Sequence, residues 1–393
     1  MTEKTPARIV ILGAGVAGVR ISQRLERRLT PHEAQIILID ENDYHQYLYR
    51  IHEVCNLEYR DNDIIVSLSR IINMRRVDFR QASIQHIDTE TKTIFTDFEN
   101  VSYDVCVVAL GSHVAYFGIK GLEENSMTLN SFESAKKIKA RIHQLFEEAK
   151  KTGKPPKILI GGGGFTGVEL AGELSDYIPI LCKKYGVESS NTGITIVEAL
   201  SSILPGWSEK QIIRAQNTLR ARRIELILND PIIHVSKDKV EMKSGRIIEP
   251  DLLIWTGGVR GDPACGLDFQ IKNRRISIDE YCRAEGHNDI FVAGDSACAV
   301  NALNNRPMPP TAHIAMVQGD IVMNNIVAML RETPMKKYIY TRPGEIVTLG
   351  KTNAVGDLFG FKFSGFLAKF MKNVVHWWYL YMIGGFKLIL ENL

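Results

Sequence analysis

The chain has 393 residues, 45% of them hydrophobic, and a formal net charge of +3. This length has room for two domains and an appendage, and the composition is ordinary for a globular protein. So small a positive charge gives no reason to expect a nucleic-acid partner.

A glycine fingerprint lies near the N-terminus. A β-branched apolar run is followed by Gly13, Gly15 and Gly18, then by a helix-like segment and a second apolar run that ends at Asp40. Glycines alone also occur in ordinary turns, but this strand, loop, helix and acidic strand end together are typical of a dinucleotide site. The helix N-terminus offers N–H groups to a pyrophosphate. We expect Asp40 to accept hydrogen bonds from a ribose.

A second unit of the same kind begins in the middle of the chain. Its glycines are Gly162, Gly164 and Gly167, and its second apolar run ends at Glu198. The interval to Glu198 is longer than the usual ~20 residues, which we assign to an insert around Pro179–Gly193. A carboxylate at Glu198 would repel a 2'-phosphate, so the sequence favours NADH over NADPH.

Two further segments support FAD in the first unit and a nicotinamide nucleotide in the second. The apolar strand at residues 290–293 leads into Gly294 and Asp295, whose carboxylate can bind the ribityl hydroxyls of a flavin. The buried strand that begins at Val105 ends in small residues, including Ala109 and Gly111, and suits the crossing between the two domains.

These elements resemble the type II NADH dehydrogenases, which are single-subunit NADH:quinone oxidoreductases with two dinucleotide-binding domains. The resemblance covers nearly the whole chain. It is carried by the two fingerprints together with Asn42–His45, Val108–Ser112, Gly164–Leu174, Trp255–Gly261, Gly294–Asp295 and Pro309–Gly319. It implies an α/β fold, the cofactors FAD and NADH, a membrane quinone as acceptor and no proton pumping. We assign Ala109, Gly111 and Gly257 to cofactor binding on the same basis.

The family's quinone motif is altered in this chain. The segment matching Ala312–Val317 usually reads Ala-Gln-x-Ala-x-Gln, but His313 and Val317 replace the two glutamines. His313 could hydrogen-bond a quinone carbonyl or hand it a proton near neutral pH, and Gln318 could offer an amide. The alternative is that His313 is merely satisfied by a neighbour.

Glu169 is the third candidate catalytic residue. It follows the last fingerprint glycine by two positions, and the resemblance places a carboxylate there near the nicotinamide and the flavin. Such a side chain could carry protons to the reduced site. The alternative is an acidic residue that only interacts with the helix dipole. Glu173, one turn further on, is expected to be structural.

The tail predicts a membrane-interface helix. Residues 361–393 hold nine aromatic residues, four lysines and one acid. A helix over Phe366–Met382, closed by Gly384 and Gly385, would gather aromatic side chains on one face, with Lys369, Lys372 and His376 on the other. We expect the rings at headgroup level and the lysines toward anionic lipid. Docking on the protein's own core or on a dimer partner is the alternative.

These expectations define the domains and the location. An FAD domain of residues 1–115 and 272–332, doubly wound, would enclose an NADH domain of residues 116–271, followed by a membrane-association region, 333–393. No apolar run reaches the ~20 residues that span a bilayer, and the N-terminus shows no signal peptide. The protein should therefore lie on the cytoplasmic face of the cell or inner membrane, in a respiratory chain. Homodimer formation stays open.

Other functions remain open. A sulfide:quinone oxidoreductase shares the fold and FAD but needs cysteines beside the flavin, and here the last cysteine is Cys298. The six cysteines include no CxxC pair, so neither a metal site nor a disulfide framework is expected. A redox sensor or interaction protein regulated by FAD and NADH is a non-enzyme alternative. A soluble reductase of a ferredoxin or a disulfide would have no need for the tail.

Overall fold

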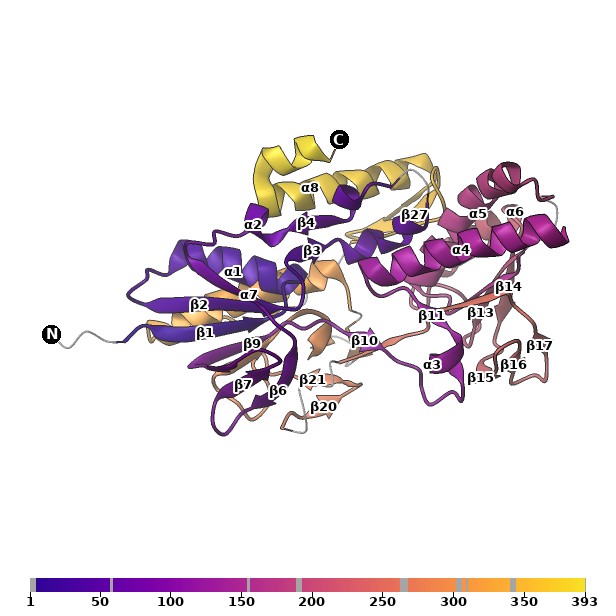
Figure 1. The fold of residues 1–393 in the computed structure, drawn as a ribbon. Coiled ribbons are helices and arrows are strands. Elements are labelled where there is room, and N and C mark those ends of the chain that lie inside the picture. Colours follow the sequence, from indigo (N-terminus) through magenta and orange to yellow (C-terminus); the bar gives the residue numbers. More distant parts are fainter. Residues whose placement is uncertain are drawn as a thin grey trace.

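The structure is a computed structural model of the chain. It describes residues 5–56, 59–153, 156–188, 193–261, 268–301, 306–308, 310–339 and 344–392. Two five-stranded parallel sheets lie side by side, and the C-terminal helix runs along one side of the molecule across the first of them (Figure 1).

The first sheet has the strand order β22-β9-β1-β2-β5. Its strands are β1 (Ala7–Leu12), β2 (Ala34–Asp40), β5 (Val77–Gln81), β9 (Val105–Val108) and β22 (Ile290–Val292). Helices α1 (Val16–Arg28) and α7 (Ala312–Leu330) pack on one face and share a hydrophobic core with it. Because β22 comes late in the sequence, the chain leaves this sheet after β9 and returns to it.

The second sheet has the order β11-β18-β12-β13-β14. Its strands are β11 (Met127–Thr128), β12 (Ile158–Gly161), β13 (Ile194–Glu198), β14 (Ile224–Leu228) and β18 (Leu252–Trp255). Side chains alternate between the faces, as a pleated strand requires. Ile158 and Ile160 pack under helices α4 (Phe132–Thr152), α5 (Phe165–Tyr185) and α6 (Glu209–Ala221), whereas Leu159 belongs to the core of the opposite face.

Smaller elements surround the two sheets. Strand β23 (Ala297–Cys298) pairs in parallel with β21 (Arg275–Ser277). The other small strands pair antiparallel, and so does β21 with β20: these strands are β3 (Tyr44–Gln46), β4 (Ile65–Ser67), β6 (Ile84–Asp88), β7 (Thr93–Thr96), β8 (Asn100–Ser102), β10 (His113–Val114), β15 (Ile232–Val235), β16 (Val240–Met242), β17 (Ile247–Ile248), β19 (Val259–Arg260), β20 (Ile271–Lys272), β24 (Val300–Asn301), β25 (Arg306–Pro307), β26 (Glu345–Thr348), β27 (Ala354–Leu358) and β28 (Phe361–Ser364). The short helices are η1 (Leu48–Cys55), η2 (Asp61–Asp63), α2 (Leu68–Ile71), α3 (Leu122–Asn125) and η5 (Gly294–Ser296). The β10–β19 ribbon joins the segments that cross between the sheets.

The extra residues that the sequence places around Pro179–Gly193 mainly lengthen helix α5. Helix α5 continues through Pro179 and ends at Tyr185, so it has 21 residues where α1 has 13. Gly186 then caps it with a φ of +68°, the left-handed conformation that glycine adopts most easily. The longer interval before Glu198 is therefore mostly helix.

The tail forms the helix that the sequence predicts, but it ends later than expected. Helix α8 (Phe366–Glu391) begins at the expected residue, but it does not end at the glycine pair. Instead it kinks at Gly385 (φ 70°, ψ −167°) and continues. The aromatic residues Phe366, Phe370, Trp378 and Tyr381 are exposed.

Lys372 and His376 of α8 are turned into the protein, which corrects the expectation that this face of the helix is turned toward lipid. His376 is buried, and the Lys372 side chain is only 13% exposed. The same side of the helix contributes Tyr379, Leu380 and Ile383 to the core of the first sheet. The tail thus docks on the protein with one face and leaves the aromatic face free.

Among the described helices, α7 is long and apolar enough to cross a bilayer by length and composition. However, 56% of its apolar window is buried inside the protein, where it packs against α1. Arg20 on α1 and Asp320 on α7 fix this packing through paired hydrogen bonds of 2.8 and 2.9 Å.

Candidate active site

The first glycine of each fingerprint makes a tight turn against a neighbouring strand end. Gly13 and Gly162 have φ values of +97° and +115°. A Cβ on Gly13 would lie 2.4 Å from the carbonyl oxygen of Ala109, and one on Gly162 would lie 2.7 Å from the Cα of Gly257. Both the backbone conformation and the lack of space therefore require glycine.

The other glycines shape a cradle at each helix N-terminus. A Cβ on Gly18 or Gly167 would lie 1.8 or 2.0 Å from the carbonyl oxygen of the first glycine in the same loop, so these residues let the helix lie close to the strand. In contrast, a Cβ on Gly15 or Gly164 would meet no atom within 4 Å. Each loop thus leaves open space where N–H groups of α1 or α5 can bind a phosphate.

The two acidic strand ends occupy equivalent positions. The Asp40 carboxylate accepts a 2.6 Å hydrogen bond from the N–H of Ala14, and the Glu198 carboxylate accepts one of 2.7 Å from the N–H of Gly163. In each case the other oxygen accepts a 2.8 Å bond from the N–H two residues further on. Burial raises the pKa of Asp40 against the effect of these bonds. Through these hydrogen bonds both carboxylates hold their fingerprint loops in place, and each retains lone pairs that can accept hydrogen bonds from a ribose.

A cavity of about 400 Å³ opens in front of the first fingerprint. It is lined by residues from both halves of the chain, from η1 and from α8. Seven predicted site residues meet there: Gly15, Ala109, Gly111, Glu169, Gly294, Asp295 and His313. Gly13, Gly18 and Asp40 lie in or beside the adjoining loop, while Gly162, Gly164, Gly167, Glu198 and Gly257 gather at the carboxyl edge of the second sheet.

Asp295 and Gly294 form one wall of this cavity. Gly294 has a φ of +72°, and Asp295 follows it on the short helix η5. The hydroxyl of Ser112 donates a 3.2 Å hydrogen bond to the Asp295 carboxylate. Burial raises the pKa of Asp295, and this effect outweighs that bond.

Gln318 lies elsewhere than the sequence suggested. It is fully buried and is not among the residues that line the cavity. Its Oε1 accepts a 2.8 Å hydrogen bond from the N–H of Gly294, and its Nε2 has no partner among the described residues. The side chain therefore supports the Gly294 turn from behind.

His313 lines the cavity from the first turn of α7. Burial lowers its pKa below the ordinary histidine value, so the imidazole is neutral near pH 7. Its Nε2 is buried and has no hydrogen-bond partner within the described part of the chain. This nitrogen therefore does not fit the alternative expectation, in which a neighbouring residue hydrogen-bonds to His313.

Glu169 is held by groups from three other elements. It pairs with Lys372 of α8, its Oε2 lies 3.5 Å from His52 Nδ1, and its Oε1 accepts hydrogen bonds of 2.9 and 3.1 Å from the N–H and hydroxyl of Thr348. Burial alone would raise the pKa of Glu169, but Lys372, His52 and the hydrogen bonds together lower it. Glu169 is therefore a buried carboxylate at the cavity wall.

Glu173, the next acid on α5, is held differently. Its carboxylate accepts a 2.5 Å hydrogen bond from the Asn56 amide, and burial raises its pKa to about 7. Glu173 does not line the cavity.

The sequence did not identify the partners of Glu169. His52, Thr348 and Lys372 are separated from it by 100 residues or more, and none belongs to a motif quoted above. The one sequence feature that points to such a partner is Lys372 on the aromatic tail, and from the sequence we expect this lysine to face lipid.

A second buried contact ties α8 to η1. Arg50 donates a 2.6 Å hydrogen bond to Nε2 of His376, and Nδ1 of His376 lies 2.7 Å from the hydroxyl of Tyr49. Since Nε2 accepts, the proton of the neutral ring lies on Nδ1 and is donated to Tyr49. Burial and, to a lesser degree, Arg50 lower the pKa of His376 to about 3.

The described cysteines, Cys55, Cys106, Cys182, Cys282 and Cys298, are all buried, and none lines the cavity. Cys298 lies in β23 with its sulfur 3.7 Å from the Asn273 amide. Cys265 lies outside the described residues. No group of three or more His, Cys, Asp or Glu side chains in the described part of the chain could hold a metal ion.

Comparison with known proteins places the chain in a family. Residues 7–319 match the pyridine nucleotide-disulphide oxidoreductase family model. The chain is 33% identical to the type II NADH:quinone oxidoreductase of Staphylococcus saprophyticus, with 98% of each chain covered, and 32% identical to that of Staphylococcus aureus, again over 98% of each.

Solved structures share the fold. NDH2 from Plasmodium falciparum in complex with NADH superposes with a TM-score of 0.86 at 17% identity, covering 98% of this chain and 97% of the other. The sulfide:quinone oxidoreductase of Aquifex aeolicus gives a TM-score of 0.78 at 20% identity, covering 96% and 91%. At these identities the likeness concerns the fold alone. The family match and the full-length identity to the staphylococcal enzymes show that the chain belongs to the type II NADH:quinone oxidoreductases.

Proposed function

We propose that this protein oxidises NADH and reduces a membrane quinone, without proton pumping. The observation that carries the proposal is the single cavity at which the first fingerprint, the Gly294–Asp295 turn and the Glu169–Lys372 pair meet. When bound, FAD supplies the two-electron chemistry between NADH and the quinone. The overall reaction consumes NADH, one proton and a quinone, and yields NAD⁺ and a quinol.

The residues present fit both cofactors. The open space at Gly15 and Gly164 suits two pyrophosphates, and Asp40 and Glu198 have lone pairs for the ribose hydroxyls. We therefore propose that residues 1–115 and 272–332 hold FAD and that residues 116–271 hold NADH. The carboxylate of Glu198 favours NADH because it would repel the 2'-phosphate of NADPH.

His313 and Glu169 are the proposed proton-handling groups. A quinone takes up two protons when it is reduced to a quinol. His313 offers an imidazole nitrogen without a protein partner, and Glu169 is a buried carboxylate between a lysine and a histidine. Both line the same cavity. Gln318 is proposed to support the flavin side of the site through Gly294.

We propose that residues 333–393 attach the protein to the cytoplasmic face of the membrane. The exposed side of α8 carries Phe366, Phe370, Trp378 and Tyr381, a composition that favours the bilayer interface. Lys372 and Val375 of the same helix line the cavity. A quinone dissolved in the membrane would therefore have a short route to the site.

Anaerobic stopped-flow absorbance of the yellow protein tests the proposed reaction. Mixing with NADH should bleach the flavin, and a short-chain quinone should then restore its colour. Bleaching by sulfide but not by NADH would overturn the proposal in favour of a sulfide:quinone oxidoreductase. Bleaching by NADH with no recovery on adding quinone would instead favour the redox-sensor alternative.

The role of His313 is tested by a matched pair of variants. His313→Gln retains a hydrogen-bonding group but cannot transfer a proton, so it should slow quinone reduction by about a hundredfold. His313→Phe loses the hydrogen bond as well and should slow that half-reaction by about tenfold more. Flavin bleaching by NADH should be unaffected in both variants. Equal rates for the two variants would argue against hydrogen bonding by His313.

A further inference from the structure

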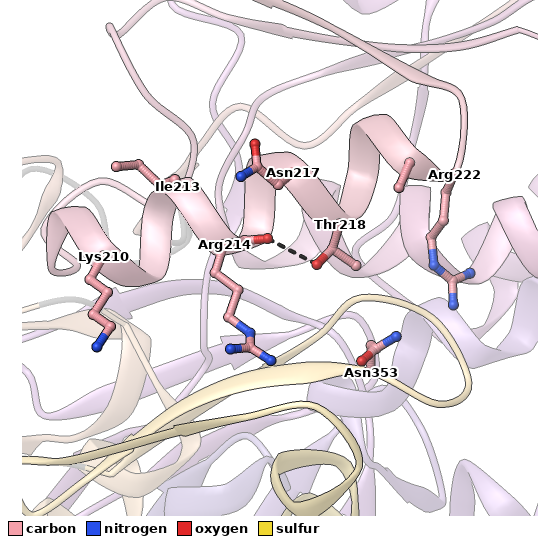
Figure 2. Close-up of a pocket in the computed structure, with 8 residues that line it drawn as sticks. Lys210, Ile213, Arg214, Asn217, Thr218, Arg222 and Asn353 are labelled. Carbon is pink, nitrogen blue, oxygen red and sulfur yellow. Dashed lines mark hydrogen bonds between the residues drawn. The ribbon is translucent and has the colours of Figure 1, made fainter.

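A groove of about 580 Å³ lies between α6 and the turn that joins β26 to β27, away from the cavity described above (Figure 2). Its polar lining consists of Lys210, Arg214, Asn217, Thr218, Arg222 and Asn353. None of the described lining residues is acidic. Hydrogen-bond donors with net positive charge are the chemistry that binds an oxyanion.

Helical spacing places the cations along one side of α6. Lys210 and Arg214 differ by four positions, which places them on one face of α6. Arg222 follows at the C-cap, so the three cations extend over about 18 Å along the helix at 1.5 Å per residue. Arg222 is already engaged, because it donates to Asp176 at 2.7 Å and to Ser175 at 2.9 Å. Lys210 and Arg214 are exposed and have no acidic partner among the described residues.

The groove adjoins the exposed aromatic face of α8. A Cβ at Gly365, the residue that precedes α8, would lie 3.9 Å from Arg214 Nη2 and 3.9 Å from Asn353 Oδ1. The next residue, Phe366, is 75% exposed, and Phe361 on the neighbouring strand β28 is 80% exposed. Figure 1 shows α6 and α8 along the same side of the molecule. Cationic and apolar surfaces are thus continuous.

We propose that this groove binds the phosphate headgroup of an anionic phospholipid, with Lys210 and Arg214 as the principal contacts. The inference rests on the membrane attachment proposed above and adds a lipid preference to it. This surface suits a lipid better than a soluble phosphate compound. The cationic groove opens beside the exposed side chains of Phe361 and Phe366, which suit acyl chains. Each cation at an anionic membrane surface strengthens binding about fivefold at moderate salt.

Vesicle flotation of the full-length protein tests the proposal. The vesicles contain phosphatidylcholine alone or equal parts of phosphatidylcholine and phosphatidylglycerol. The double variant Lys210→Ser/Arg214→Ser should lose about 25-fold in affinity for the mixed vesicles and nothing for phosphatidylcholine. The matched control, Lys237→Ser/Lys243→Ser, removes the same charge from the β15–β16–β17 sheet and should bind as the wild type does.

The outcomes separate the two proposals. Failure of the wild type to float with either vesicle would overturn membrane attachment, and the headgroup site with it. Flotation of the wild type with equal losses in both double variants would overturn only the groove, since net charge alone would explain the effect. Unaltered vesicle binding in the groove variant would overturn the headgroup site. If the wild type but not that variant then bound glycerol phosphate in calorimetric titrations, with no such difference for sulfate at equal ionic strength, the groove would be assigned to a soluble phosphate compound instead.

Discussion

Lys372 of the C-terminal helix forms an ion pair with Glu169, which lies 203 residues earlier on the second turn of α5. The same helix positions His376 between Arg50 and Tyr49 of η1. Helix α8 therefore contributes to the wall of the active-site cavity and touches both halves of the chain there. A segment that the sequence marks as a membrane anchor is also part of the site.

Replacement of Lys372 should change the pH dependence of quinone reduction. In Lys372→Met, Glu169 loses the largest of the influences that oppose its burial, so the pKa of Glu169 should rise. The protonated form then persists to higher pH, and the acid limb of the pH–rate profile for flavin reoxidation should move upward. Loss of one partner of a buried pair should also destabilise the fold by about 3 kcal/mol. Lys387→Met, on the exposed end of the same helix, is the control and should leave the profile in place.

Deletion of the tail should be more damaging than the sequence implies. If the tail served only to bind membranes, removal of residues 361–393 would leave the rest of the fold unaffected. In the structure, Tyr379, Leu380 and Ile383 belong to the core of the first sheet, and burial of each such side chain is worth about 2 kcal/mol. The truncated protein should therefore have a markedly lower melting temperature and retain FAD poorly.

Substitutions on the exposed aromatic face of α8 separate its membrane binding from its packing against the protein. Phe366→Ser/Phe370→Ser/Trp378→Ser should release the protein from vesicles while NADH still bleaches the flavin at the wild-type rate. A truncated protein as stable as the full chain would contradict the docking of α8. Vesicle binding by the triple variant at wild-type strength would contradict the interface role of its aromatic face.

Glu198→Ser should erode selectivity for NADH over NADPH. The carboxylate braces the Gly163 N–H and lies at the strand end that meets the ribose in this type of fold. Its loss should raise the KM for NADH by about tenfold, the effect of roughly one charged hydrogen bond, and reduce the penalty for a 2'-phosphate. Glu225→Ser, an exposed acid on the adjacent strand β14, removes the same charge and should leave the ratio of kcat/KM values unaltered.

Stability should fall as the pH drops below about 6.5. Burial lowers the pKa of His45 and His52 to about 4, and that of His376 to about 3, from the ordinary value of 6.5. Between those values the unfolded chain binds more protons than the native one, so the unfolding free energy decreases with falling pH. Denaturant titrations between pH 7 and pH 4, followed by tryptophan fluorescence, should show this decrease in the unfolding free energy.

His376→Asn tests this assignment. The variant should reduce the dependence of the unfolding free energy on pH by up to one proton, because asparagine does not titrate. His32→Asn, at an exposed histidine, should reproduce the wild-type slope. Identical slopes in all three proteins would mean that His376 is not protonated on unfolding in this range.

The sequence alone determined the two nucleotide units, because their chemistry depends on local backbone. Gly13 and Gly162 need positive φ, Gly18 and Gly167 need close helix packing, and Asp40 and Glu198 follow their fingerprints at short range. Such requirements leave a readable spacing in the chain, and the structure has all six residues in equivalent positions. The aromatic periodicity of the tail likewise predicted the start of α8 and its exposed face.

Only the tertiary structure decided which groups surround Glu169 and which way α8 faces. His52, Thr348 and Lys372 come from η1, β26 and α8, and nothing in their local sequence requires them to meet. A helix with one aromatic and one polar face can pack either face against its own protein. The sequence periodicity is the same in both cases, so it does not predict the orientation of α8. Here the buried carboxylate of Glu169 on α5 pairs with Lys372, since an uncompensated buried charge would cost several kcal/mol. The neutral ring of His376 is held on the same side of α8 by a hydrogen bond from Arg50 of η1. The aromatic residues are left outside because the core of the first sheet is filled by Tyr379, Leu380 and Ile383.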